Sequence, residues 1–129
     1  MNKILVEVSV GELLDKISIL EIKKERIKDT DKLKFINEEY EILKKELDKN
    51  TKSDGTLVKL FNALKNINSK LWIIEDDKRL CEKNSDFGEK FIKLSRDVHF
   101  LNDERAKIKL EINKLTKSKI KEIKEYTNY

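Results

Sequence analysis

Polar and charged side chains gather at helical spacing in the second half of the chain, beside apolar positions of the same spacing. Steps of three and four residues place them on two helical faces, which a turn near Ser85 brings opposite each other. They are Trp72, Glu75, Asp76, Arg79, Arg96, Asn102, Arg105 and Lys109. As one cleft they would offer a stacking surface, carboxylates for acid–base chemistry and cations for an anionic ligand. The alternative interpretation is a set of interhelical salt bridges that fix helix register, with Trp72 as an ordinary core residue.

Arg105 stands out among these residues because it interrupts an apolar heptad series. The apolar members of that series are Phe87, Phe91, Leu94, Val98, Leu101, Ile108, Ile112 and Leu115. A full charge at a heptad core position usually needs a buried partner or an open cavity. We therefore expect Arg105 to point into a polar cavity that it shares with Asn102, Lys109 and a carboxylate. Glu21, or an acidic residue of the helix that carries Trp72, is the candidate for that carboxylate.

The sequence gives weaker evidence for a metal site or a catalytic nucleophile than for the cleft. Metal sites in helical bundles use Glu-x-x-His pairs, whereas the one histidine, His99, follows Arg96 at that spacing. Cys81 falls on an apolar seam, which favours a buried, inert thiol over a nucleophile. The sequence thus predicts no metal site and no cofactor.

The elements that carry these residues are four helices in one domain, residues 1–129. Ser9 and Glu12 form the pattern of a capping box, so the first helix should run from about Val10 to Lys28. The second follows a break at 29–31, and a loop at 49–55 separates it from the third. A turn at 84–86 leads into the fourth, capped by Ser85 or Asp86 and ending near 116–118. The predicted fold is all-α: an antiparallel bundle of four main helices, with long, coiled-coil-like third and fourth helices.

The two ends of the chain suggest a small β element. Ile4–Val8 is β-branched and extended in character. An isolated strand needs a partner for its backbone groups. Residues 118–126 suit either a helix or a strand, and as a strand they could pair with Ile4–Val8 within the chain or in a second copy.

Composition agrees with a helical protein that crosses no membrane. Of the 129 residues, 42% are charged, none is proline and three are glycine, which favours helix. No apolar run reaches the length of a membrane span, and the lone cysteine fits a reducing cytoplasm. Residues 105–129 hold eight Lys or Arg against three Asp or Glu. That excess favours a solvated helix face and tail over a nucleic-acid surface, because neither a phosphate-binding loop nor a zinc knuckle accompanies it.

Four stretches, taken in order, carry a resemblance to a known family: Ile4–Lys16, Leu71–Asp77, Asp86–Gly88 and Asn102–Arg105. They resemble a small bacterial and phage family catalogued only as a domain of unknown function. The resemblance covers nearly the whole chain and implies a small soluble protein that stands alone. It brings with it no activity, ligand or site residues. The Lys-Glu-Ile-Lys run at 121–124 departs from the more strand-like end of that family.

Two classes of function remain open. The first is a non-enzymatic, self-associating interaction module, with a homodimer or another homo-oligomer as the expected state because two-fold contacts are the commonest solution. The second is a small helical enzyme, or a binder of an anionic metabolite, that uses the cleft described above. A looser likeness of the first helix to the all-helical chorismate mutases supports only this second class.

Overall fold

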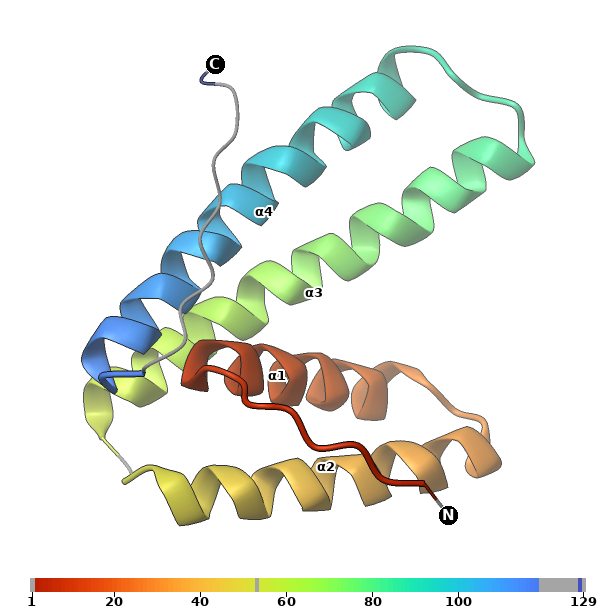
Figure 1. Ribbon diagram of the computed structural model, residues 1–129. Helices are drawn as coiled ribbons and strands as arrows, with labels where there is room; N and C mark the ends of the chain where they lie inside the picture. Colours follow the sequence, from red (N-terminus) through yellow and green to blue (C-terminus); the bar gives the residue numbers. More distant parts are fainter. Residues whose placement is uncertain (1, 53, 119–127, 129) are drawn as a thin grey trace.

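The computed structural model describes residues 2–52, 54–118 and 128, and it is all-α over these residues (Figure 1). Its helices are α1 (Val10–Arg26), α2 (Thr30–Asn50), α3 (Gly55–Lys83) and α4 (Glu89–Leu115). The expected four-helix content and the all-α class are therefore confirmed. No strand occurs in the described ranges.

Helix α1 lies at the centre of the arrangement. It packs along α2, α3 and α4, and α3 and α4 also pack along each other. Figure 1 shows two hairpins, α1–α2 and α3–α4, that lie close together at one end and diverge toward the other. The four helices are thus arranged about α1 rather than about a common bundle axis.

The start of α1 follows the expected cap in part. The Ser9 hydroxyl accepts a hydrogen bond from the Glu12 amide at 3.0 Å, as a capping box requires. The Glu12 side chain does not return that bond, since its carboxylate accepts from Lys109 instead. At the other end α1 stops at Arg26, two residues before the expected Lys28, because Ile27 is extended.

Local side chains also set the later helix starts. Asp29 accepts from the Lys32 amide at the start of α2, and Asp54 accepts from the Thr56 amide at the start of α3. The expected cap of α4 is wrong: α4 begins at Glu89 after Gly88, which has no side chain to cap it. The two expected cap residues, Ser85 and Asp86, lie in the turn before α4. Ser85 has a φ of 53°, which ends the helical path of α3, and the Asp86 side chain accepts a hydrogen bond from the Gly88 amide.

The buried apolar core sits where the two hairpins meet. It contains Leu14 and Ile17 of α1, Leu47 of α2, Leu57 and Leu64 of α3, and Ile112 of α4. The heptad seam of α4 is consequently buried at one end only. Ile112 is fully buried, whereas Phe87 at the α3–α4 turn is 52% exposed. The half of the α3–α4 hairpin near that turn extends beyond the core.

The proposed strand at Ile4–Val8 is not formed in the described chain. These residues are extended but unpaired, and their side chains are exposed. The tail that was the candidate partner lies, apart from Ser118, largely outside the described residues. We refer to Ile4–Val8 below as the N-terminal arm.

Gly11 is the point where α1 and α4 come closest. A Cβ atom at this position would lie 2.6 Å from the Lys109 carbonyl oxygen and 2.8 Å from Asn113 Oδ1. Both neighbours are held, one as helix backbone and the other by its hydrogen bond to the Gly11 amide. Only glycine allows this approach.

We expect Gly11→Ala to lower the free energy of unfolding by about 2 kcal/mol or more, because it forces α1 and α4 apart. Gly55→Ala is the matched control: nothing lies within 4 Å of a Cβ there, so the change should leave stability equal or raise it by up to about 1 kcal/mol. Urea denaturation followed by circular dichroism measures both. Equal midpoints for the two variants would contradict the close contact.

Candidate functional site

The most prominent polar feature is a buried carboxylate on α1, that of Asp15, which is 2% exposed. Its Oδ1 accepts hydrogen bonds from Arg105 Nε and from Asn68 Nδ2, both at 2.9 Å. Its Oδ2 accepts from the Nη2 of Arg105. Arg105 therefore binds the carboxylate in a bidentate way, through two nitrogens, which is the strongest geometry for an arginine–carboxylate pair.

A second ion pair lies beside the first. Lys109 Nζ is 2.7 Å from Glu12 Oε2 and 3.7 Å from Asp15 Oδ2, and the Lys109 side chain is almost fully buried. Ser18 completes the group, because Asn68 Nδ2 also donates to its hydroxyl at 2.8 Å. We call these six residues the Asp15 cluster: Glu12, Asp15, Ser18, Asn68, Arg105 and Lys109.

Helical spacing explains how three helices supply the Asp15 cluster. Arg105 and Lys109 are four residues apart, so they project from one face of α4. Asp15 and Ser18 are three apart on α1, and Asn68 comes from the middle of α3. Each side chain reaches the group only if the three helices keep their relative levels. The contacts of the Asp15 cluster therefore form in only one register of α1 against α3 and α4.

The electrostatics favour the charged form of Asp15 at neutral pH. Burial by itself raises the pKa of this carboxyl, but hydrogen bonds from Arg105 and Asn68, together with the charges of Arg105 and Lys109, outweigh that effect. The net result is a pKa below the ordinary aspartate value. A general acid or base for neutral pH needs the opposite change, so Asp15 is poorly suited to proton transfer.

The charges of the Asp15 cluster also balance within it. Arg105 and Lys109 contribute two positive charges, and Glu12 and Asp15 contribute two negative ones. An anionic ligand would have to compete with both carboxylates for these cations. The geometry suits a structural ion-pair network better than an anion site.

The start of α1 is bound to α4 by backbone as well as side chains. Asn113 Oδ1 accepts from the Gly11 amide at 2.7 Å, and Ser118 Oγ accepts from the Val10 amide at 3.0 Å. The first amides of a helix have no hydrogen-bond partner within the helix. Asn113 and Ser118 supply the acceptors for two of these amides at the start of α1. The Nδ2 of Asn113, which is buried, has no hydrogen-bond partner within the described structure.

The structure brings together three of the eight residues that the sequence singled out. Arg105 and Lys109 belong to the Asp15 cluster, and Asn102 Oδ1 lies 3.5 Å from Nη1 of Arg105. The other five make no hydrogen bond or ion pair with the described residues. Trp72 is half-buried, and the remaining four are exposed: Glu75, Asp76, Arg79 and Arg96.

The carboxylate that pairs with Arg105 is Asp15, not Glu21. Glu21 instead accepts from the Tyr40 hydroxyl at 3.3 Å and from Lys65 Nζ at 3.1 Å. Burial, followed by the Glu21 carboxylate, raises the pKa of Tyr40. This second group ties α1 to α2 and α3 on a different side of α1.

Asp15 falls within the first predicted helix, but the sequence does not set the level of that helix relative to the others, so it does not predict the pairing of Asp15 with Arg105. One signal could have identified it. Gly11, Asp15 and Ser18 recur at steps of four and three, which marks a second buried face of small and polar residues beside the apolar one. Such a face needs a polar partner on a neighbouring helix.

The described part of the chain offers neither a metal site nor a membrane-spanning helix. No group of three or more His, Cys, Asp or Glu residues there could hold a metal ion. None of the helices there is both long and apolar enough to cross a membrane.

Comparison with known proteins places the chain in a family. The model of a family of unknown function, DUF6165, matches residues 4–129. The chain belongs to this family. Neither the curated proteins nor the solved structures compared include a match to it. The family assignment confirms the resemblance to a family of unknown function, and it assigns the DUF6165 protein no activity.

Arg105→Leu in this DUF6165 protein should lower the free energy of unfolding by about 1–3 kcal/mol, because it leaves Asp15 buried without its main partner. Adding Asp15→Asn to the same chain should recover part of that loss by removing the orphaned charge. Arg79→Leu is the control, since Arg79 is exposed and should tolerate the change. Denaturant midpoints measure all three, and a stable Arg105→Leu variant would show that Asp15 does not depend on Arg105.

The lowered pKa of Asp15 sets a direction for the pH dependence of stability. An unfolded aspartate titrates at about 3.9, and the folded value lies lower. The stabilisation is therefore present above the unfolded pKa and is lost as the pH falls through the folded pKa. Unfolding midpoints of wild type and Asp15→Asn should differ most near neutral pH and converge in strong acid. A constant difference at every pH would exclude titration of Asp15 as the cause.

Proposed function

We propose that this DUF6165 protein is a non-enzymatic helical interaction module that associates with itself, most simply as a two-fold dimer in the cytoplasm. The observation that carries the proposal is the exposed apolar surface on the part of the α3–α4 hairpin beyond the core. Four large apolar residues there are 46–55% exposed: Ile73, Leu80, Phe87 and Ile92. We call them the distal apolar residues.

Their arrangement suits a helical partner. Ile73 and Leu80 are seven residues apart and so share one face of α3. A shallow groove of about 390 Å³ adjoins Ile73, between α3 and α4. Its walls include Ile74 and Leu101, with Lys70 and Asp97 as charged members. An apolar groove with one charge of each sign is typical of a surface that receives another amphipathic helix.

The pattern of the two helices points the same way. The heptad seam of α4 continues to Phe91 and Phe87, well past the level that α1 covers, and α3 runs beside it. We infer an antiparallel, coiled-coil-like hairpin whose free end is completed by a second copy. Two-fold pairing covers the same apolar residues on both copies at once.

The alternative, an enzyme or a binder of an anionic metabolite, has less support. The cations expected in its cleft are either paired with Asp15 and Glu12 or, like Arg79 and Arg96, exposed on the distal hairpin. Neither the groove beside Ile73 nor the groove lined by Leu14 and Leu47 contains Trp72 or Arg105. The lowered pKa of Asp15 further disfavours acid–base catalysis.

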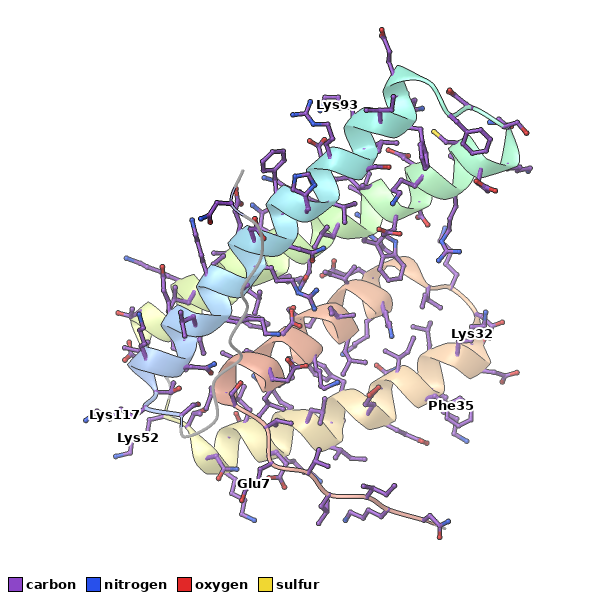
Figure 2. All side chains as sticks on the ribbon, turned by 45° about the horizontal axis from the view of Figure 1, so that its top comes forward. Glu7, Lys32, Phe35, Lys52, Lys93 and Lys117 are labelled. Carbon is purple, nitrogen blue, oxygen red and sulfur yellow. The ribbon has the colours of Figure 1, made fainter. Side chains whose placement is uncertain are left out.

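We expect light scattering coupled to size exclusion to report an oligomer of wild type. The combined change Ile73→Lys and Leu80→Lys should weaken association by placing charge on the distal face of α3. Phe35→Lys is the matched control, because Phe35 is an exposed aromatic residue on α2 that points away from the molecule (Figure 2). A wild type that stays monomeric at high concentration would refute the proposed self-association. Equal weakening of association by the two variants would show that the distal apolar residues are not the surface through which the copies associate.

A further inference from the structure

The N-terminal arm is the most exposed apolar segment of the chain. Ile4, Leu5 and Val6 are 86%, 82% and 74% exposed, and Val8 is also open to solvent. The arm runs from the start of α1 along the side of α2 (Figure 1). Its backbone and side chains make no hydrogen bond within the described structure. An extended, β-branched segment with bare backbone groups is adhesive in water.

The arm is anchored at a fixed point. The Ser9 side chain is buried and caps α1, and the next amide, that of Val10, is held by Ser118. Everything before Ser9 therefore projects from a rigid base, which lowers the entropy that the arm would lose on binding compared with a free tail.

The same chain carries an apolar groove at the corner where α2 ends and α3 begins. Its volume is about 150 Å³, and the buried side chains of Leu14, Ile17, Leu47 and Leu57 line it. Val58, which is half-exposed, and Phe61 also contribute to its wall. A cavity of this size and lining accommodates a group as large as benzene, and so one aliphatic side chain.

We propose that the arm of a second copy docks in this groove, with an aliphatic side chain of the arm seated among Leu14, Leu47 and Leu57. The contact rests on the self-association proposed above and adds a second surface to it, because the groove lies at the end of the molecule away from the distal apolar residues (Figure 1). A reciprocal exchange, in which each copy inserts its arm into the other, makes two equal contacts about a two-fold axis.

Charge supports this occupant. The groove carries both signs, with Lys44 and Lys52 beside Asp48 and Asp54. The arm is flanked by Lys3 and contains Glu7, so it too carries one charge of each sign about an apolar centre. Each charged group of the arm can thus find an opposite charge next to the groove, which an uncharged or purely acidic peptide could not do in full.

Within one copy the arm does not occupy the groove. No residue of the arm lines the groove of its own chain, and the arm's apolar side chains remain in solvent. Figure 2 shows Glu7 on the arm, separated from Lys52 at the connection between α2 and α3. Both halves of the contact are therefore available in each copy at the same time.

Cysteine cross-linking between two differently sized copies tests the exchange. Both copies carry Cys81→Ala; one adds Leu5→Cys and the other Val58→Cys. After mild oxidation of the mixture, a docked arm should give a hetero-disulfide several-fold more abundant than the control pair, Leu5→Cys with Phe35→Cys, because a disulfide requires close Cα atoms. Parallel mixtures use Ile4→Cys or Val6→Cys in place of Leu5→Cys. At least one of the three positions should then lie close to Val58→Cys, whichever side chain of the arm enters the groove.

The result can be separated from that of the proposed function. A yield no higher than the control at all three arm positions, with wild type still oligomeric by light scattering, overturns the docking and leaves the self-association standing. A monomeric wild type overturns both. A chain that carries both Leu5→Cys and Val58→Cys is oxidised as a separate sample. If it forms the disulfide within one chain while the mixture of copies gives no hetero-disulfide above the control, the arm docks in its own groove and the exchange is overturned.

Discussion

The pairing of Asp15 with Arg105 is the constraint on which the arrangement of the helices depends. A carboxylate at the centre of α1 is costly to bury unless it is paired and hydrogen-bonded. Here the partners come from α4, as Arg105 and Lys109, and from α3, as Asn68. Sliding α1 by one turn would separate all three from Asp15. The ion pair therefore specifies which level of α1 meets which level of the α3–α4 hairpin, a role that apolar packing fills less selectively.

Gly11 and Asn113 act on the same interface one turn away. The missing side chain at Gly11 lets the α1 backbone approach the Lys109 carbonyl, and Asn113 uses that closeness to bond the Gly11 amide. Lys109 thus takes part twice, by its backbone against Gly11 and by its side chain between Glu12 and Asp15. A close backbone contact and a buried ion pair support each other, which explains why α1, the shortest of the four helices, can serve as the centre of the fold.

Much of this fold follows from local sequence patterns, because helix positions and caps depend on neighbours three or four residues away. Ser9 and Asp29 mark helix starts in this way, and the heptad series identified Arg105 as a charge that needs a partner. The identity of that partner depends on the level of α1 relative to α4, which no local pattern contains. Trp72, Glu75 and Arg79 follow Asn68 at helical spacing on α3, yet of these four residues only Asn68 bonds to Asp15. The start of α4 was misplaced because Gly88, with no side chain, gives no capping signal.

The distribution of satisfied and unsatisfied groups bears on what the protein can do. Its buried charges bond to one another, and the balance of two positive and two negative groups leaves the Asp15 cluster without excess charge for a ligand. Exposed apolar surface includes the end of the α3–α4 hairpin, the N-terminal arm, and Phe35 and Ile42 on α2. Apolar surface gains free energy by leaving water, whatever its partner, so binding energy is available at such surfaces rather than at the buried charges. These exposed apolar surfaces, rather than the balanced charges of the Asp15 cluster, are the features that support the proposed interaction module.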